Sequence, residues 1–191
     1  MRFDEAWDKS RTVHGFMGSK QQGMLMYSIA SQSKACAEIG SFYGRSSILV
    51  GLAMLGHGKY YCIDTYNSEN KELHDTYGNT YDAWVNNIKH FNLSNTCIPV
   101  VGLSTDDKVI AEVPNELDFV YVDGAHDSVS TLMDIRIWSK KIKRGGLMLF
   151  HDYIWNSVSV AIQHAGISGI IEEIADVDDF GICRVISDET H

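Results

Sequence analysis

A chain of 191 residues is long enough to bury the core of one domain. Its composition, with 45% apolar and 21% charged residues, is ordinary for a soluble globular protein. The formal net charge of −9 argues against nucleic acid as a partner, because such binding needs clustered lysine and arginine side chains.

Membrane and secretion signals are absent from the sequence. No run approaches the roughly 18 apolar residues of a membrane helix, and the N-terminal region lacks a basic-then-apolar signal pattern. The four cysteines are widely spaced, each in or beside an apolar run, with no Cys-x-x-Cys pair. We therefore expect buried, reduced thiols, a cytoplasmic location and no membrane partner. The cysteines are Cys36, Cys62, Cys97 and Cys183.

The first elements in chain order are a helix over Gln21–Lys34 and a short buried strand over Cys36–Ile39. A glycine-punctuated turn, Gly40–Gly44, follows the strand and opens an apolar helix over Arg45–Leu55. This arrangement suits nucleotide-type ligands, because glycines allow close backbone approach and a helix N-terminus offers free N–H groups. The turn departs from the Gly-x-Gly-x-x-Gly of dinucleotide folds, since Ser41 and Phe42 precede its second glycine.

The next strand, Lys59–Asp64, ends in an acid about 20 residues after the turn, where an acidic side chain accepts hydrogen bonds from ribose hydroxyls. The alternative role for Asp64 is a strand-end cap. Tyr66–Asn79 is long for a strand-to-helix loop, so it is either a substrate wall or a surface excursion. A helix starting near Thr80, a strand over Cys97–Val101 and a short helix over Asp106–Val113 follow.

The second informative stretch begins with an apolar strand over Phe119–Val122. Its carboxyl end carries Asp123, Gly124 and His126, where open α/β sheets bind ligands. A helix follows to about Lys141, with Asp134 and Arg136 expected away from its buried face. That face is marked by Leu132, Ile135, Trp138 and Ile142, and Lys143–Gly146 is interpreted as a basic helix end with a glycine stop.

The last third of the chain supplies a strand over Leu147–Phe150, the triplet His151-Asp152-Tyr153 and a helix over Ser157–Ala165. Two further strands, Ile170–Ile174 and Phe180–Ile186, are expected to form an antiparallel hairpin. Strands that alternate with helices predict an α/β fold with a parallel sheet covered on both faces. No linker or repeat divides the chain, so 1–191 is predicted to be a single domain.

Three motifs together resemble class I S-adenosylmethionine-dependent methyltransferases, most closely the short, methyltransferase-24-like subgroup. They are Glu38-Ile-Gly-Ser-Phe-Tyr-Gly-Arg-Ser46, Val122-Asp-Gly-Ala-His126 and His151-Asp-Tyr153. The resemblance implies a Rossmann-like, doubly wound sheet of seven mostly parallel strands with an antiparallel last strand. It also implies that residues 1–34 form a helical cover over cofactor or substrate, with simple packing as the alternative. The implied cofactor-binding residues are Glu38, Gly40, Ser41, Tyr43, Gly44, Ser46, Asp64, Ser104 and Asp123.

Methyl transfer requires alignment of the reacting atoms and removal of a proton from the acceptor. His126 is the candidate base, because imidazole titrates near neutral pH, and catechol-type relatives carry a catalytic lysine at the matching position. Asp123 is the second catalytic candidate. The alternative is that His126 only donates structural hydrogen bonds. Tryptophans, including Trp155, are expected to pack in the core.

Asp123, His151 and Asp152 form a candidate metal site, because two converging carboxylates repel unless a cation or protonation neutralises them. Oxygen ligands favour Mg²⁺, whereas a histidine ligand favours Mn²⁺, Fe²⁺ or Zn²⁺. Catechol-type relatives carry Asp-Asn at the second position, and some sugar methyltransferases carry Asp-Asp, so His151-Asp152 is a departure. The alternative is a metal-free hydrogen-bonded pair.

The sequence therefore predicts an enzyme that methylates, through oxygen, a small molecule or sugar, with S-adenosylmethionine and either no metal or Mg²⁺ or Mn²⁺. Two alternatives stay open: a metal-using, non-methylating relative on the same fold, and a nucleoside-binding module without catalysis. The methyl acceptor and the oligomeric state are undetermined, and a homodimer is one of the options.

Overall fold

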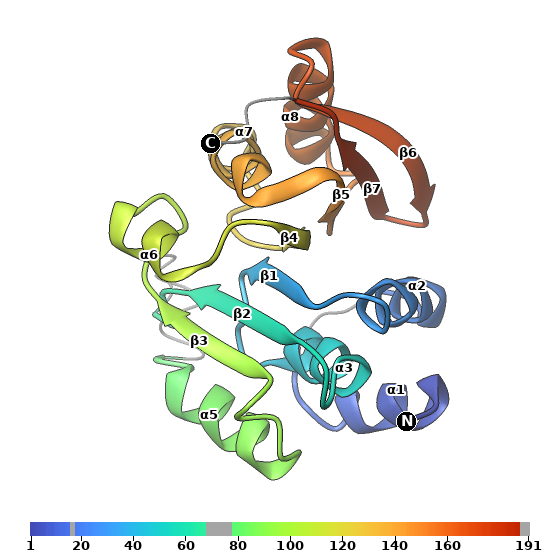
Figure 1. Ribbon diagram of the computed structural model, residues 1–191, viewed down its shortest axis with the longest axis vertical. Coiled ribbons are helices and arrows are strands. Elements are labelled where there is room, and N and C mark those ends of the chain that lie inside the picture. Colours follow the sequence, from blue (N-terminus) through green and yellow to red (C-terminus); the bar gives the residue numbers. More distant parts are fainter. Residues whose placement is uncertain (16–17, 68–77, 188–191) are drawn as a thin grey trace.

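The computed structural model describes residues 1–15, 18–67 and 78–187 and contains a seven-stranded sheet in the order β3-β2-β1-β4-β5-β7-β6 (Figure 1). The strands are β1 (Ala35–Ile39), β2 (Lys59–Asp64), β3 (Cys97–Val101), β4 (Leu117–Val122), β5 (Ile142–Phe150), β6 (Ile171–Val177) and β7 (Phe180–Val185). The helices are α1 (Phe3–Ser10), α2 (Lys20–Ala30), α3 (Arg45–Ala53), α5 (Tyr81–His90), α6 (Asp107–Glu112), α7 (Ser128–Trp138), the 3-10 turn η1 (Ser139–Lys141) and α8 (Asn156–Ile167).

Strands β1 to β5 pair in parallel, and β7 runs antiparallel to both β5 and β6. The predicted fold class, a Rossmann-like sheet with an antiparallel last strand, is therefore confirmed. The chain continues from β1 to β2 on one side and from β4 to β5 on the other, so the direction of the strand order reverses between β1 and β4. This reversal is the switch point at which doubly wound sheets bind their ligands, beyond the carboxyl ends of the strands.

Both faces of the sheet are covered around its central strands, as the alternation along β1 shows. Cys36 belongs to the buried cluster that includes residues of α1, α2, α3 and α5, whereas Ala37 and Ile39 belong to the cluster that includes residues of α6, α7 and α8. Successive side chains of a strand point to opposite faces, so one short strand contributes to two cores. Figure 1 shows the two helical layers on either side of the sheet.

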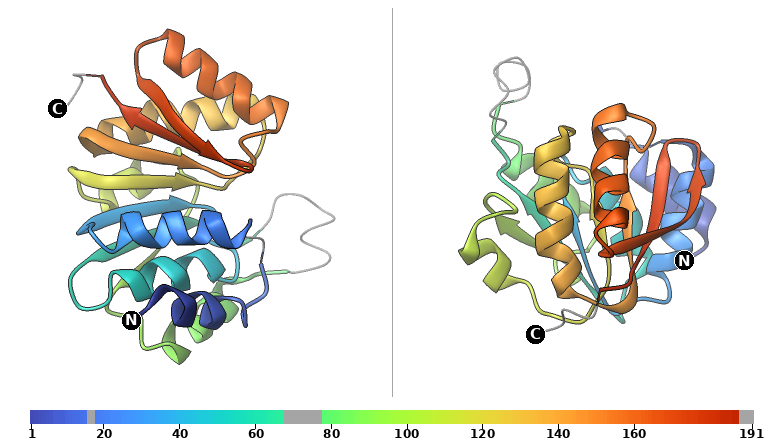
Figure 2. Two further views of the ribbon diagram at one scale, coloured as in Figure 1. Left: turned by 90° about the vertical axis from the view of Figure 1, so that its right-hand side faces the viewer. Right: turned by 90° about the horizontal axis from the view of Figure 1, so that it is seen from above.

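The N-terminal helices α1 and α2 lie beside α3 on one face of the sheet, as the left view of Figure 2 shows. Helix α2 begins with a capping box, in which Ser19 and Gln22 exchange side-chain and backbone hydrogen bonds. Ser19 Oγ also donates to Asp178 Oδ2 (2.6 Å), and Gln22 Nε2 donates to Asp179 Oδ1 (3.0 Å). The start of α2 is thus tied to the turn between β6 and β7.

The predicted helix end at Lys143–Gly146 is wrong, because these residues belong to β5. Helix α7 ends at Trp138, and β5 pairs with β4 at Leu117↔Ile142 and again at Phe119↔Leu147. Between these two pairings, the four residues Lys143–Gly146 of β5 stand opposite the single residue Asp118 of β4, which forms a bulge. The two glycines serve this bulge: Gly145 has φ +75°, and a Cβ on Gly146 would lie 2.8 Å from Asp118 O.

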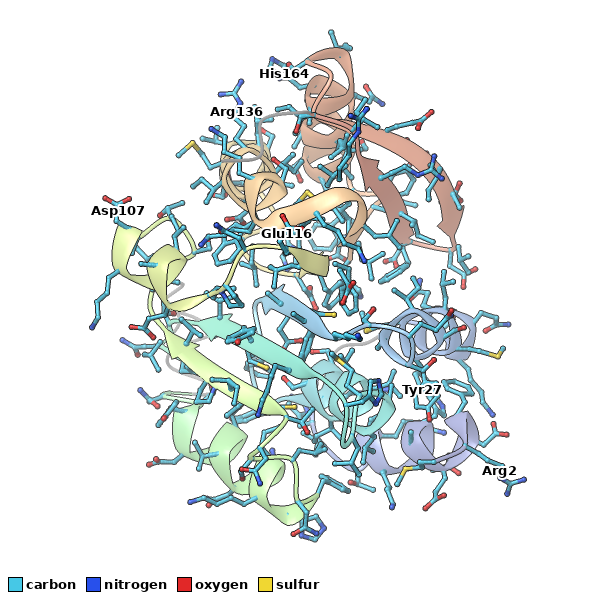
Figure 3. All side chains as sticks on the ribbon, in the orientation of Figure 1. Arg2, Tyr27, Asp107, Glu116, Arg136 and His164 are labelled. Carbon is cyan, nitrogen blue, oxygen red and sulfur yellow. The ribbon has the colours of Figure 1, made fainter. Side chains whose placement is uncertain are left out.

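Several smaller expectations are settled by burial. The four cysteines are free and buried, as predicted. Figure 3 shows Arg136 on α7 and His164 on α8 projecting outward, and both are exposed. Asp134, also expected to lie away from the buried face of α7, is 4% exposed, so that prediction is wrong. Among the described residues, no helix is long and apolar enough to cross a membrane.

Candidate active site

The turn between β1 and α3 packs directly onto the end of β4. Gly40 has φ +88°, and a Cβ at this position would lie 2.0 Å from the carbonyl oxygen of Asp123. Gly44 has φ +89°, and its Cβ would lie 2.9 Å from the ring of Trp84. Both positions combine a left-handed backbone with a close approach, which a glycine allows. The turn thereby brings Gly40 and Asp123, predicted from distant motifs, into contact.

Asp64 holds this turn in place. Its Oδ2 accepts hydrogen bonds from the backbone N–H groups of Ser41 (2.7 Å) and Phe42 (2.8 Å), and its Oδ1 accepts one from Tyr66 N (2.7 Å). An ionised carboxylate offers about four lone-pair sites, so three are occupied here. The strand-end cap is therefore present, and capacity for roughly one further donor remains.

Glu38 and Ser46 lie beneath the turn. The Glu38 carboxyl is 0% exposed and accepts hydrogen bonds from Ser46 Oγ (2.8 Å), Ser47 Oγ and Tyr60 OH (3.1 Å). Burial raises the pKa of Glu38, while the serine hydroxyls lower it in part. In this conformation both predicted side chains are buried, with 0% and 7% exposure, and they support the turn from the core side.

Ser41 and Tyr43 lie in the same turn and differ in burial. Ser41 is buried, and its Oγ has no aligned hydrogen-bond partner within the described part of the chain. Tyr43 is partly buried, its ring lies 4.3 Å from that of Phe42, and its carbonyl accepts a hydrogen bond from Asn87 Nδ2 (2.9 Å). Helix α5 therefore helps to hold the turn through the Tyr43 backbone.

Ser104, in the loop after β3, is fixed by helix α7. Its Oγ donates to Asp134 Oδ1 (2.6 Å), and its carbonyl accepts from Trp138 Nε1 (3.1 Å). Burial raises the pKa of Asp134 to about 6, and the Ser104 hydrogen bond lowers it in part. Sequence reasoning missed this partner, because the hydrophobic pattern of α7 placed Asp134 on the solvent side.

Asp123 lies between a tyrosine and a histidine at the end of β4. Its Oδ2 accepts a hydrogen bond from Tyr121 OH (3.1 Å), and its Oδ1 lies 3.3 Å from His151 Nδ1. Burial raises the pKa of Asp123 to about 7, although His151 and Tyr121 stabilise the charged form. The nearby Asp152 carboxylate raises it further.

His126 faces Asp152 across the site. Its Nδ1 is 3.1 Å from Asp152 Oδ2, and its side chain is 36% exposed. Burial lowers the pKa of His126, and this effect exceeds the attraction of Asp152 for the imidazolium. Asp152 adopts φ +51°, a left-handed conformation that is uncommon for a non-glycine residue and recurs at functional sites.

His151 lies near a third carboxylate, that of Asp179. Its Nδ1 is 3.2 Å from Asp152 Oδ1, yet neither this contact nor the one to Asp123 has hydrogen-bond geometry. Burial opposes its charged form, but the carboxylates of Asp123, Asp152 and Asp179 outweigh that effect and raise the pKa of His151. Asp179 was not predicted. The pairing Phe150↔Gly181 between β5 and β7 carries the β6–β7 turn to this edge of the sheet.

Two groups of side chains within the described residues could hold a metal ion. In each group the ligand atoms lie within 4.8 Å of one another, and Asp152 belongs to both. The predicted trio of Asp123, His151 and Asp152 is thus divided between them. We call Asp123, His126, His151 and Asp152 the carboxylate–histidine cluster. The two groups are Asp123 with His126 and Asp152, and His151 with Asp152 and Asp179.

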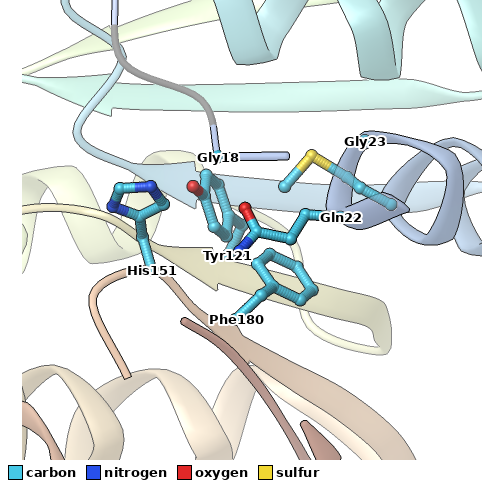
Figure 4. A pocket seen from close by; sticks show the side chains of 7 residues that line it. Gly18, Gln22, Gly23, Tyr121, His151 and Phe180 are labelled. Atoms are coloured by element: carbon cyan, nitrogen blue, oxygen red, sulfur yellow. The ribbon is translucent and has the colours of Figure 1, made fainter. Parts of the chain in front are cut away.

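Two small hollows flank the cluster on opposite sides of the sheet. The first lies against α2 and is lined by Gln22, Tyr121, His151 and Phe180 (Figure 4). The second lies toward α7 and α8 and is lined in part by His126. In this conformation neither hollow has room for more than about one water molecule, far less than the roughly 300–1,000 Å³ of ordinary ligand pockets. The predicted substrate wall at Tyr66–Asn79 falls mostly outside the described residues.

Sequence comparison identifies the family. Residues 37–153 match the family described as "Methyltransferase domain", which spans more than half of the chain. The chain therefore belongs to this methyltransferase family, and the resemblance inferred from the three motifs is confirmed. The matched region runs from β1 through the carboxylate–histidine cluster to Tyr153. No curated protein matches the chain significantly.

Solved structures share the fold at low sequence identity. The O-methyltransferase NovP superimposes with a TM-score of 0.75 at 15% identity, covering 97% of this chain and 89% of that chain. The O-methyltransferase from Bacillus cereus, in complex with SAH, gives 0.71 at 15% identity, covering 96% and 90%. TomG from Streptomyces achromogenes, in complex with SAM, gives 0.68 at 16% identity, covering 97% and 89%. These likenesses establish the fold of a class I methyltransferase.

Proposed function

We propose that this protein is an S-adenosylmethionine-dependent O-methyltransferase acting on a hydroxyl group of a small molecule or sugar. The observation that carries the proposal is the contact between the glycine turn and Asp123, with His126 and Asp152 beside it. A turn suited to a nucleoside-bearing cofactor and a candidate base are thereby neighbours at one switch point. The SAH and SAM in the related structures support the same cofactor.

The residues present fit this cofactor. After capping the turn, the Asp64 carboxylate can still accept a hydrogen bond from a ribose hydroxyl. The Ser104 loop, which Asp134 fixes in place, offers a wall for the adenine ring. When bound, the cofactor supplies an electrophilic methyl group on sulfur. The protein must orient the acceptor hydroxyl toward that methyl and remove its proton.

His126 is the group proposed to take that proton. Burial lowers its pKa, which favours the neutral imidazole that a base requires. Asp152, 3.1 Å from Nδ1, stabilises the imidazolium that forms and fixes the ring orientation. The exposed part of the ring leaves room for the acceptor.

A divalent cation also fits the cluster. Asp123, Asp152 and His126 place their ligand atoms within 4.8 Å, so an ion held by all three would take the place of His126 as the group that activates the acceptor. Two carboxylates at this spacing repel unless a cation or a proton intervenes. Carboxylate and imidazole together suit Mn²⁺, and Mg²⁺ prefers oxygen ligands. Bound there, the ion would lower the pKa of a coordinated acceptor hydroxyl.

Cofactor use is tested by calorimetric titration with S-adenosylhomocysteine. Asp64→Ala is expected to weaken binding by roughly 1.5–3 kcal/mol, the range for lost hydrogen bonds to a charged group. Asp107→Ala, a carboxyl removed from the exposed start of α6, is the matched control and should bind like the wild type. Because Asp64 also holds the turn, unfolding of the ligand-free variants is measured in parallel. Unchanged affinity in Asp64→Ala would remove this residue from the site.

The base is tested by replacing His126 with glutamine and, as a control, the exposed His164 of α8 with glutamine. General base catalysis contributes about 10²–10⁴-fold, so kcat of His126→Gln should fall by about that factor. Affinity for S-adenosylhomocysteine should stay nearly constant. An unchanged rate would assign the proton to another group of the cluster, and a loss of cofactor binding would make His126 a structural residue.

A further inference from the structure

One tryptophan of the four is set apart from the others. Trp7, Trp84 and Trp138 are 5%, 1% and 0% exposed, whereas Trp155 is 50% exposed. The expectation that Trp155 packs in the core is therefore wrong. Its indole ring instead lies 5.3 Å from the His126 imidazole, with the two planes at 58°. The indole is therefore open to solvent beside the candidate base and is not part of the core.

The backbone that carries the indole is anchored at the first turn of α8. Trp155 N donates to Asp152 O (2.8 Å), and Ser157 Oγ donates to His126 O (2.6 Å). The backbone on either side of the indole is therefore fixed to both members of the His126–Asp152 pair. A tryptophan side chain has only two torsions to restrict, so it loses little entropy when a ligand stacks on it.

The surroundings of Trp155 combine exposed apolar side chains with carboxylates. Ile154, its neighbour in the chain, is 68% exposed, and Val129, in the first turn of the adjacent α7, is 71% exposed. The charged partners of Asp152 and Asp123 in the described structure are histidines. As long as no cation occupies the cluster, a phosphate or carboxylate on the acceptor would meet these carboxylates and be repelled.

Building on the proposed function, we infer that Trp155 is the wall against which the acceptor lies. The acceptor is then a hydroxylated ring with a flat face, uncharged where it meets the protein. A phenolic ring and the apolar face of a sugar share this property. A ring on the indole directs its hydroxyl toward His126, because the two side chains are in contact.

Binding is tested without any need for turnover. Because Trp155 is the exposed tryptophan, the neutral quencher acrylamide reports mainly on its fluorescence. Catechol and methyl α-glucopyranoside are added separately at millimolar concentration, with phenyl phosphate as the charged counterpart. The expected result is that at least one neutral ring shields Trp155, that phenyl phosphate does not, and that Trp155→Phe shows no shielding. The ring that protects identifies the acceptor class. Protection by neither neutral ring, or by phenyl phosphate equally, would overturn the inference.

Kinetics supply a second measurement, using an acceptor found by screening hydroxylated rings for methylation. Trp155→Ala should raise KM for the acceptor about three- to tenfold, the usual worth of an aromatic contact. Trp155→Phe should recover most of this, and KM for S-adenosylmethionine should stay within about twofold. Ile167→Ala, which removes an exposed apolar side chain at the far end of α8, is the control. If Trp155→Ala methylates the acceptor with an unchanged KM, the inference about Trp155 is refuted and the proposed function stands. If no acceptor is methylated, the proposed function is refuted, and the quenching result decides whether a ring binds at Trp155.

Discussion

Replacing Asp134 with asparagine should change the pH dependence of stability in a defined direction. Burial raises the pKa of this carboxyl to about 6 in the folded protein, against 3.8 for the free side chain. Between these values the unfolded chain ionises while the folded chain keeps its proton. The free energy of unfolding contributed by this group therefore falls as pH rises from about 4 to 6, and the penalty is constant above that range.

The magnitude follows from the shift. About two units at 1.36 kcal/mol per unit amount to about 3 kcal/mol of destabilisation at neutral pH. Asparagine retains a carbonyl oxygen that can accept the Ser104 hydroxyl but cannot ionise. Asp134→Asn should consequently gain up to about 3 kcal/mol relative to the wild type between pH 4 and pH 7.5.

The assay is urea unfolding followed by circular dichroism at a series of pH values, with the wild type and the variant measured together. Other carboxyls titrate in both proteins, so the difference between the two curves isolates Asp134. A constant offset reflects the amide hydrogens and does not bear on the reasoning. A difference that is independent of pH would refute it, because Asp134 would then titrate normally in the folded state.

Three further outcomes are expected. Gly40→Ala should destabilise the fold and weaken S-adenosylhomocysteine binding, because its Cβ would lie 2.0 Å from Asp123 O. Gly56→Ala, at a similar φ of +85° but with open space around the Cβ, should cost only the ~1–2 kcal/mol of left-handed strain. Equal free energies of unfolding in urea for the two variants would contradict this expectation. Gln22→Ala should lose about 1–2 kcal/mol in urea unfolding through the capping box and the bond to the β6–β7 turn, while the exposed neighbour Gln21→Ala should change little, and similar losses would deny the tie a role. Exhaustive chelation should lower methylation, with recovery on adding Mg²⁺ or Mn²⁺; full activity in protein shown by elemental analysis to be metal-free would leave the carboxylate–histidine cluster as a set of ion pairs.

Local patterns were sufficient to predict the elements that position the site. Apolar runs bounded by turns located the strands, with β2 and β3 found at their observed bounds. Gly40 and Gly44 located the turn, because positions with a left-handed backbone favour glycine and can be recognised in the sequence. The carboxyl-end rule then placed Asp64, Asp123 and Asp152 at one edge of the sheet.

Side-chain partners were a different matter. Glu38 and Ser46 belong to the recognised motif, yet the fold turns them toward each other beneath the turn. Asp134 lies outside the apolar pattern of α7 and is buried because the Ser104 loop covers it. A periodic pattern records which face of an element is apolar, but it carries no information about which distant loop lies over the other face.

What the sequence determined by itself is the sheet, its order of elements and the family, because these depend on hydrophobic periodicity and on short motifs. Only the tertiary structure decided the composition of the site. The pairing of β5 with β7 brings Asp179 close to His151. The start of α8 is hydrogen-bonded to the loop that follows β4, which places the exposed Trp155 beside His126. Such contacts arise between residues 28 or more positions apart, and register and packing, which are properties of the whole fold, bring them together.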